Sequence, residues 1–184
     1  MFWAMAMNLL HRRHCSSAGW EKAVANQLLP WALQHVELGP RTLEIGPGYG
    51  ATLQALLGLT ASLTAVEVDN SMVERLNRRY GQRARIIRGD GTQTGLPDDH
   101  FTSVVCFTML HHVASAQLQD QLFAEAYRVL QPGGVFAGSD GVPSLPFRQY
   151  TSPTPTLRSP RRTSPVGCEL WDSLISTSMS RALA

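Results

Sequence analysis

The sequence predicts a single α/β domain in which helices cover both faces of a doubly wound, mostly parallel sheet. Short apolar segments alternate along the chain with segments of helical periodicity. A Gly-rich turn at residues 46–50 joins the first of these apolar segments to a helix. The chain has 184 residues, of which 43% are hydrophobic, and this is enough for one compact core. Strands that alternate with helices form right-handed crossovers, so the sheet is expected to be mostly parallel.

The elements follow this pattern in order. Apolar residues recur at roughly every fourth position from Trp20 onward, which predicts a leading helix or helix pair that Pro30 divides. Ser71 and Glu74 form a capping box at the start of a helix that we expect to stop at Gly81. Strands are predicted at residues 41–45, 63–68, 84–88, 103–108 and 135–138, and helices at residues 51–57, 71–80 and 118–130.

The chain changes character after the fifth predicted strand. Residues 150–165 are almost all Ser, Thr, Pro or Arg, a composition that breaks strands and cannot build a core. We therefore expect the folded domain to occupy residues 40–147, after an N-terminal helical segment at residues 1–39. Residues 148–184 are expected to form a disordered or weakly docked tail.

Composition and charge argue against several classes of protein. The net charge is +2 and the basic residues are scattered up to a short Arg cluster near the end of the chain, so we expect neither nucleic acid nor an anionic membrane as a partner. No apolar run approaches the roughly 18 residues of a membrane span. Cys15, Cys106 and Cys168 lie far apart, which argues against disulfides and favours a reducing, cytoplasmic setting. His11, His14 and Cys15 lack a matched fourth ligand, so no metal site is predicted.

The Gly-rich turn and the end of the second strand together indicate a ligand that contains a nucleoside. Gly46, Gly48 and Gly50 allow the chain to turn sharply and let a ligand approach the backbone. Glu67 closes the second strand about twenty residues later, where folds of this class place a carboxylate that binds ribose hydroxyls. Dinucleotide enzymes share both features, so a nicotinamide or flavin cofactor is an alternative.

Two further acidic positions help to choose between these ligands. Glu44 lies in the first strand just before the turn, where its carboxylate would repel a pyrophosphate and attract a cation. Asp90 follows the third strand and can accept a hydrogen bond from the adenine amine, while Gly91 leaves room for the ring. An Asx turn is an equally good interpretation of Asp90 alone. Together the acids favour an adenosine ligand that carries positive charge.

Five motifs in chain order resemble those of the class I S-adenosylmethionine-dependent methyltransferases. The resemblance is to the small-molecule enzymes of methyltransferase type 11, which are similar to the ubiquinone and menaquinone C-methyltransferases. It implies a Rossmann-like fold, S-adenosylmethionine as the cofactor, and methyl transfer to a small-molecule acceptor. Thr102 departs from the family, which commonly has aspartate before the fourth strand. The motifs are residues 43–50, 64–69, 89–91 with 96–97, 107–113 and 128–134.

The resemblance also implies which part of the cofactor each motif holds. The acid of the second strand would bind the ribose, and the segment after the third strand would bind the adenine. The acid of the first strand and the Gly-rich turn would bind the methionine end, and the backbone at the end of the fourth strand would line the methyl side. The predicted cofactor-binding residues are Glu44, Gly46, Gly48, Gly50, Glu67, Asp90, Gly91 and Phe107.

Catalysis is less specified by the resemblance than cofactor binding. Methyl transfer from a sulfonium needs a base only if the acceptor must lose a proton, and His111 of the pair His111 and His112 is the candidate. Residues 1–39 would form a lid over the cofactor. The C-terminal β-hairpin of the family is missing or degenerate in this sequence. A catalytically impaired S-adenosylmethionine-binding protein is therefore one alternative, and an NAD-dependent oxidoreductase is a less favoured one.

Overall fold

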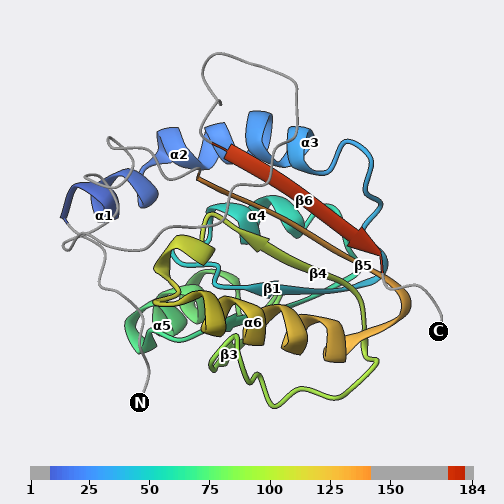
Figure 1. The fold of residues 1–184 in the computed structure, drawn as a ribbon. Helices are drawn as coiled ribbons and strands as arrows, with labels where there is room; N and C mark the ends of the chain where they lie inside the picture. Colours follow the sequence, from blue (N-terminus) through green and yellow to red (C-terminus); the bar gives the residue numbers. More distant parts are fainter. Residues whose placement is uncertain (1–8, 142–173, 181–184) are drawn as a thin grey trace.

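A computed structural model of the chain describes residues 9–141 and 174–180. Their centre is a six-stranded sheet of order β3-β2-β1-β4-β5-β6, in which the first five strands are parallel and β6 is antiparallel to β5 (Figure 1). The strands are β1 Arg41–Ile45, β2 Ser62–Glu67, β3 Arg85–Arg88, β4 Phe101–Phe107, β5 Leu130–Gly141 and β6 Leu174–Ser180. The predicted doubly wound parallel sheet is confirmed.

Helices pack on both faces of the sheet, with α1 to α4 above it and α6 below it in the view of Figure 1. One core cluster joins the N-terminal helices, α4 and α5 to the sheet, and includes Val24, Leu53 and Leu76. The other joins α6 to the opposite face through Leu122 and Val129. The helices are α1 Leu9–Cys15, α2 Ala18–Ala23, the π-helical η1 Val24–Leu28, α3 Leu29–Ala32, α4 Ala51–Leu56, α5 Asn70–Tyr80, the 3-10 helix η2 Leu110–His112 and α6 Ala116–Val129.

The start of α5 differs from the predicted capping box. Asp69, and not Ser71, is the N-cap: its Oδ1 accepts hydrogen bonds from the backbone N–H groups of Ser71 and Met72. Glu74 bonds instead to the side-chain amide of Asn70. Aspartate and serine both cap helices well, so the sequence offers two starts two residues apart, and the earlier one is used. The predicted stop at Gly81 is confirmed, because Gly81 is the C-cap.

The structure also places a strand in the segment for which the sequence predicts none. β6 lies within the predicted tail and pairs along β5 from Val135 opposite Ser180 to Gly141 opposite Leu174. Residues 174–180 contain no proline, glycine or charged residue, so nothing in them opposes pairing through backbone hydrogen bonds. Residues 142–173 and 181–184, the rest of the predicted tail, lie outside the described residues.

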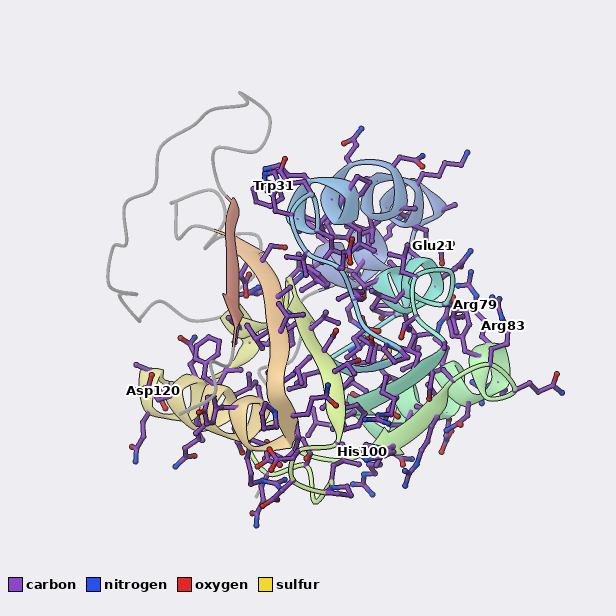
Figure 2. The ribbon with its side chains drawn as sticks, turned by 90° about the vertical axis from the view of Figure 1, so that its right-hand side faces the viewer. Glu21, Trp31, Arg79, Arg83, His100 and Asp120 are labelled. Carbon is purple, nitrogen blue, oxygen red and sulfur yellow. The ribbon has the colours of Figure 1, made fainter. Side chains whose placement is uncertain are left out.

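An ion pair links the N-terminal helices to the rest of the domain. Arg79 of α5 donates to Glu21 of α2 at 2.6 Å and to Gln54 of α4 at 2.6 Å, and Figure 2 shows Glu21 and Arg79 close together on one side of the molecule. These contacts hold α2 beside α4 and α5. In the part of the chain that the structure describes, no helix has the length and apolarity that crossing a bilayer requires.

Candidate functional site

A cavity of about 350 Å³ opens at the carboxyl ends of β1, β2 and β4, between the sheet and the N-terminal helices. This is where the strand order reverses, since β2 and β4 flank β1, and open α/β sheets bind ligands at this point. The predicted residues that line the cavity are Gly46, Gly48, Glu67, Asp90, Gly91 and Phe107. Glu44, Gly50 and His111 do not line it: Glu44 is buried in β1, Gly50 caps α4, and His111 contacts Asp140 of β5.

The Gly-rich turn lines the cavity through Gly46 and Gly48. Gly46, Gly48 and Gly50 all have positive φ, of 72°, 53° and 87°. A Cβ atom on Gly46 would lie 2.4 Å from Met109, whereas a Cβ atom on Gly48 would meet nothing within 4 Å. Gly46 is therefore required for packing, and Gly48 leaves open space beside the backbone that a ligand can approach.

Glu67 holds the turn and faces the cavity at the same time. Its Oε2 accepts a hydrogen bond from the N–H of Gly48 at 3.0 Å, and its Oε1 accepts one from the N–H of Asp69 at 2.9 Å. The residue is 6% exposed, and this burial raises the pKa of the carboxyl group, against the backbone N–H groups of Asp69, Gly48 and Val68, which lower it. Each carboxylate oxygen has a second lone pair, so Glu67 can also accept from ribose hydroxyls.

Glu44 is buried in the middle of the sheet, directly below the turn. It pairs with Ala65 of β2 and Val105 of β4 and is 1% exposed. Its Oε1 accepts a hydrogen bond from Thr52 of α4, and its Oε2 has no hydrogen-bond partner among the described residues. Burial raises the pKa of Glu44 to about 8, which the Thr52 hydroxyl opposes and the nearby Glu67 reinforces. A positive ligand charge above the turn would stabilise the ionised carboxylate.

Asp90 forms an Asx turn, one of the two roles that the sequence leaves open. Its Oδ1 accepts from the N–H of Thr92 at 2.8 Å and from the Thr92 hydroxyl at 2.7 Å, which is an Asx turn. Both of these hydrogen bonds use Oδ1, and Asp90 also lines the cavity. Gly91 packs against the core, because a Cβ atom there would lie 2.6 Å from Ile45.

The sequence does not point to two residues near the end of β4. Thr108 has a φ of 49°, an unusual conformation for a residue with a branched side chain, and its N–H donates to Ser139 of β5 at 2.7 Å. Thr108 and Met109 line the cavity beside Phe107. Strained backbone at the end of a central strand is typical of binding sites. A threonine at this position gives no sign of that strain in the sequence.

The two histidines after β4 lie in different environments. The ring Nδ1 of His111 lies 2.6 Å from Oδ1 of Asp140, and the backbone N–H of His111 donates to Oδ2 of Asp140 at 2.8 Å. His112, and not His111, lines the cavity. His11 of α1 stacks on His112, with ring centroids 5.2 Å apart. Burial, with the neighbouring histidines, lowers the pKa of His11 to about 4 and that of His112 to about 3, so both rings are neutral at pH 7.

The N-terminal helices cover the cavity from one side. Cys15 and Trp20 line it, and the Nε of Arg12 donates to the hydroxyl of Tyr49 in the Gly-rich turn at 3.3 Å. Arg12 therefore joins α1 to the turn that a ligand would contact.

Known proteins with similar sequences are methyltransferases. Residues 43–138 match the family described as a methyltransferase domain. The chain is 44% identical to the ribosomal RNA small subunit methyltransferase A of Cupriavidus taiwanensis over 54 residues, which are 29% of this chain and 20% of that protein. It is 29% identical to the sterol methyltransferase-like 3 of Botryococcus braunii over 117 residues, 60% of this chain and 29% of that one. It is 32% identical to a probable S-adenosylmethionine-dependent methyltransferase of Mycolicibacterium smegmatis over 104 residues, 56% of this chain and 39% of that one.

Solved structures show the same fold. PH0226 from Pyrococcus horikoshii has a TM-score of 0.64 at 19% identity, covering 73% of this chain and 60% of that one. The glycopeptide N-methyltransferase MtfA, solved with S-adenosyl-L-homocysteine, has a TM-score of 0.57 at 22% identity, covering 65% of this chain and 53% of that one. The matched segments span well under half the length of the sequence relatives. The family match covers more than half of this chain, which therefore belongs to the class I S-adenosylmethionine-dependent methyltransferases.

Proposed function

We propose that the chain binds S-adenosylmethionine in the cavity and transfers its methyl group to a small-molecule acceptor. The observation that carries this proposal is the charge of the site. Carboxylates stand in or beside the cavity at the ends of β1, β2 and β3, and no lysine or arginine is among the described residues that line it. A pyrophosphate cofactor needs cations or several free N–H donors, whereas a sulfonium with an ammonium group needs acids. This charge pattern argues against the alternative NAD-dependent oxidoreductase.

We place each part of the cofactor beside the residues whose charge and hydrogen-bonding groups match it. Glu67 accepts from the ribose hydroxyls, and the carboxylate of Asp90 accepts from the adenine amine. The methionine end lies over the Gly-rich turn, above the buried carboxyl group of Glu44, and the sulfonium methyl group points along Phe107 toward the acceptor. In this arrangement the acids surround every positively charged or hydrogen-bond-donating part of the cofactor.

The chemical step requires mainly positioning. In-line displacement at a sulfonium methyl group proceeds when donor and acceptor are held close together. If the acceptor must lose a proton, His111 is the candidate base, because Asp140 holds its Nδ1 and leaves Nε2 as the proton acceptor. His111 does not line the cavity, whereas His112 does. A role of His111 as the base therefore needs His112 to move or a water molecule to relay the proton.

The acceptor is proposed to be a small, largely apolar molecule. The apolar side chains that line the cavity include Trp20, Met109, Val113, Leu118 and Leu122. The net charge of +2 gives little reason to expect RNA as the acceptor, although one group of relatives acts on ribosomal RNA. Cys15 and Cys106 are free thiols, and on this basis we keep the proposal of a reducing, cytoplasmic setting.

The test of this function is transfer of an isotopically labelled methyl group. The purified chain is incubated with labelled S-adenosylmethionine, a mixture of small apolar acceptors and, separately, ribosomal RNA. Label in the organic extract supports the proposal, and label only in RNA overturns the acceptor class. Cofactor binding without label in any product would support the alternative of a donor-binding protein that is catalytically impaired.

The contact between Arg12 and Tyr49 gives a prediction about the proposed lid at residues 1–39. Arg12→Ala removes the link between α1 and the Gly-rich turn, so we expect S-adenosylmethionine to dissociate several-fold faster while its association rate changes little. Stopped-flow measurement of Trp20 fluorescence follows dissociation, because Trp20 lines the cavity. The adjacent Arg13, exposed on the same helix, provides the control. Equal dissociation rates in Arg12→Ala and Arg13→Ala would contradict a lid function of α1.

A further inference from the structure

Three histidines from distant parts of the sequence meet at the edge of the cavity. His11 comes from α1, and His111 and His112 come from η2. One ring nitrogen of each lies within 4.8 Å of the corresponding nitrogens of the other two. No acidic or thiol group belongs to the cluster in the described part of the chain, so its donors are imidazole nitrogens alone.

The second ring nitrogen of His111 is already occupied in a way that suits a metal ligand. Asp140 lies 2.6 Å from Nδ1, which fixes the ring and leaves the buried Nε2 as the nitrogen that can serve as a metal ligand. Histidines that bind metal ions commonly donate their other N–H to a carboxylate in this manner. Packing of three histidine rings does not by itself require a carboxylate beside one of them, so the position of Asp140 supports a metal site.

His112 supplies a second observation that points to a ligand. Its Nδ1 is buried and has no hydrogen-bond partner among the described residues. A buried polar nitrogen without a partner costs free energy, and a coordinated cation would remove that cost. His11, only 5% exposed, closes the cluster from the side of α1.

We propose that His11, His111 and His112 bind one divalent transition-metal ion of the class that prefers imidazole, of which Zn²⁺ is the simplest. Three nitrogen donors suit Zn²⁺, Co²⁺ or Ni²⁺ and are a poor site for Mg²⁺ or Ca²⁺, which prefer oxygen. Zn–N bonds of about 2.0–2.1 Å place tetrahedral ligand atoms about 3.4 Å apart. The three nitrogens lie within 4.8 Å of one another, so small rotations of the rings would reach this spacing.

The site has two consequences beyond the proposed methyl transfer. The ion would join α1 to η2 and so fasten the helix that covers the cavity. Three protein ligands also leave a fourth position, and because His11 and His112 line the cavity, that position is accessible to an oxygen or nitrogen atom of a bound molecule. A bound ion would occupy Nε2 of His111 and so exclude its action as a base.

The test is metal binding by the untagged full chain after treatment with a chelator. We expect one Zn²⁺ per chain in competition with a chromophoric chelator, and one Co²⁺ with the visible spectrum of a tetrahedral site. His112→Gln should weaken Zn²⁺ binding by about 100-fold and Asp140→Asn by about 10-fold, since ligands and their carboxylate partners both set affinity. Circular dichroism checks that the variants fold.

His14→Gln provides the matched control, because His14 is an exposed residue of the same helix and lies outside the cluster. Its Zn²⁺ affinity should equal that of the unaltered chain. Absence of stoichiometric binding, or binding that survives both His11→Gln and His112→Gln, would overturn the proposal. The titration contains no S-adenosylmethionine, so its failure is distinct from a failure of the proposed function.

Discussion

Replacing Glu67 by alanine should weaken S-adenosylmethionine binding by about 100-fold, because two kinds of interaction are lost. The carboxylate no longer accepts from the ribose, and the N–H of Gly48 loses the acceptor that lies 3.0 Å away. Glu67→Gln should be almost as damaging, since an amide directs a donor toward one of the two N–H groups that the carboxylate accepts from. Calorimetric titration measures both.

Glu74→Ala is the control for Glu67, because Glu74 is an exposed acid on α5 with a single side-chain partner, Asn70. It should bind the cofactor as the unaltered chain does. Binding by Glu67→Ala within about threefold of that value would show that the cofactor does not use the end of β2.

Glu44→Gln should have opposite effects on stability and on cofactor binding. The pKa of Glu44 rises from 4.5 to about 8 in the folded chain, so the folded state keeps a proton that the unfolded state loses above pH 4.5. Stability from this group therefore falls as pH rises from 4.5 to 8. Glutamine does not titrate, so the variant should be more stable than the unaltered chain at pH 8, by about 1–3 kcal/mol, with little difference at pH 5.

Cofactor binding should change in the other direction. A cationic ligand favours the ionised carboxylate, so binding at pH 7 should release a proton from Glu44. Calorimetry in two buffers of different ionisation enthalpy detects this proton. Glu44→Gln should abolish its release and weaken binding by about 10-fold or more. Glu37→Gln provides the control, because Glu37 is exposed, and it should leave proton release and binding unchanged. Unchanged proton release in Glu44→Gln would place the ligand charge elsewhere.

The sequence predicts the parts of this molecule that depend on local patterns. β1 is found at the predicted residues, and the other parallel strands overlap their predicted ranges, because buried parallel strands are continuous apolar segments between turn residues. The spacing of Gly48 and Glu67 along the chain predicts that both residues lie at the cofactor site. Their direct hydrogen bond is not, since spacing gives proximity but not the orientation of a carboxylate.

Features that depend on distant residues could not be predicted. His11 meets His111 and His112 only because α1 folds across the carboxyl ends of the strands, and the local grouping of His11 with His14 and Cys15 suggests a different set. Thr52 donates a hydrogen bond to Glu44 from the other side of the Gly-rich turn, and no sequence motif predicts this contact. β6 depends on the free edge of β5, and pairing at an edge uses backbone atoms that every residue has.

The most direct test of the proposed cofactor is a calorimetric comparison of three ligands with the purified chain: S-adenosylmethionine, S-adenosylhomocysteine and NAD. We expect micromolar binding of both methionine-derived ligands, with proton release on binding of S-adenosylmethionine. We expect no detectable binding of NAD, because the described residues that line the cavity offer acids and no cation to a pyrophosphate. Binding of NAD in preference to S-adenosylmethionine would contradict the assignment of S-adenosylmethionine to the cavity.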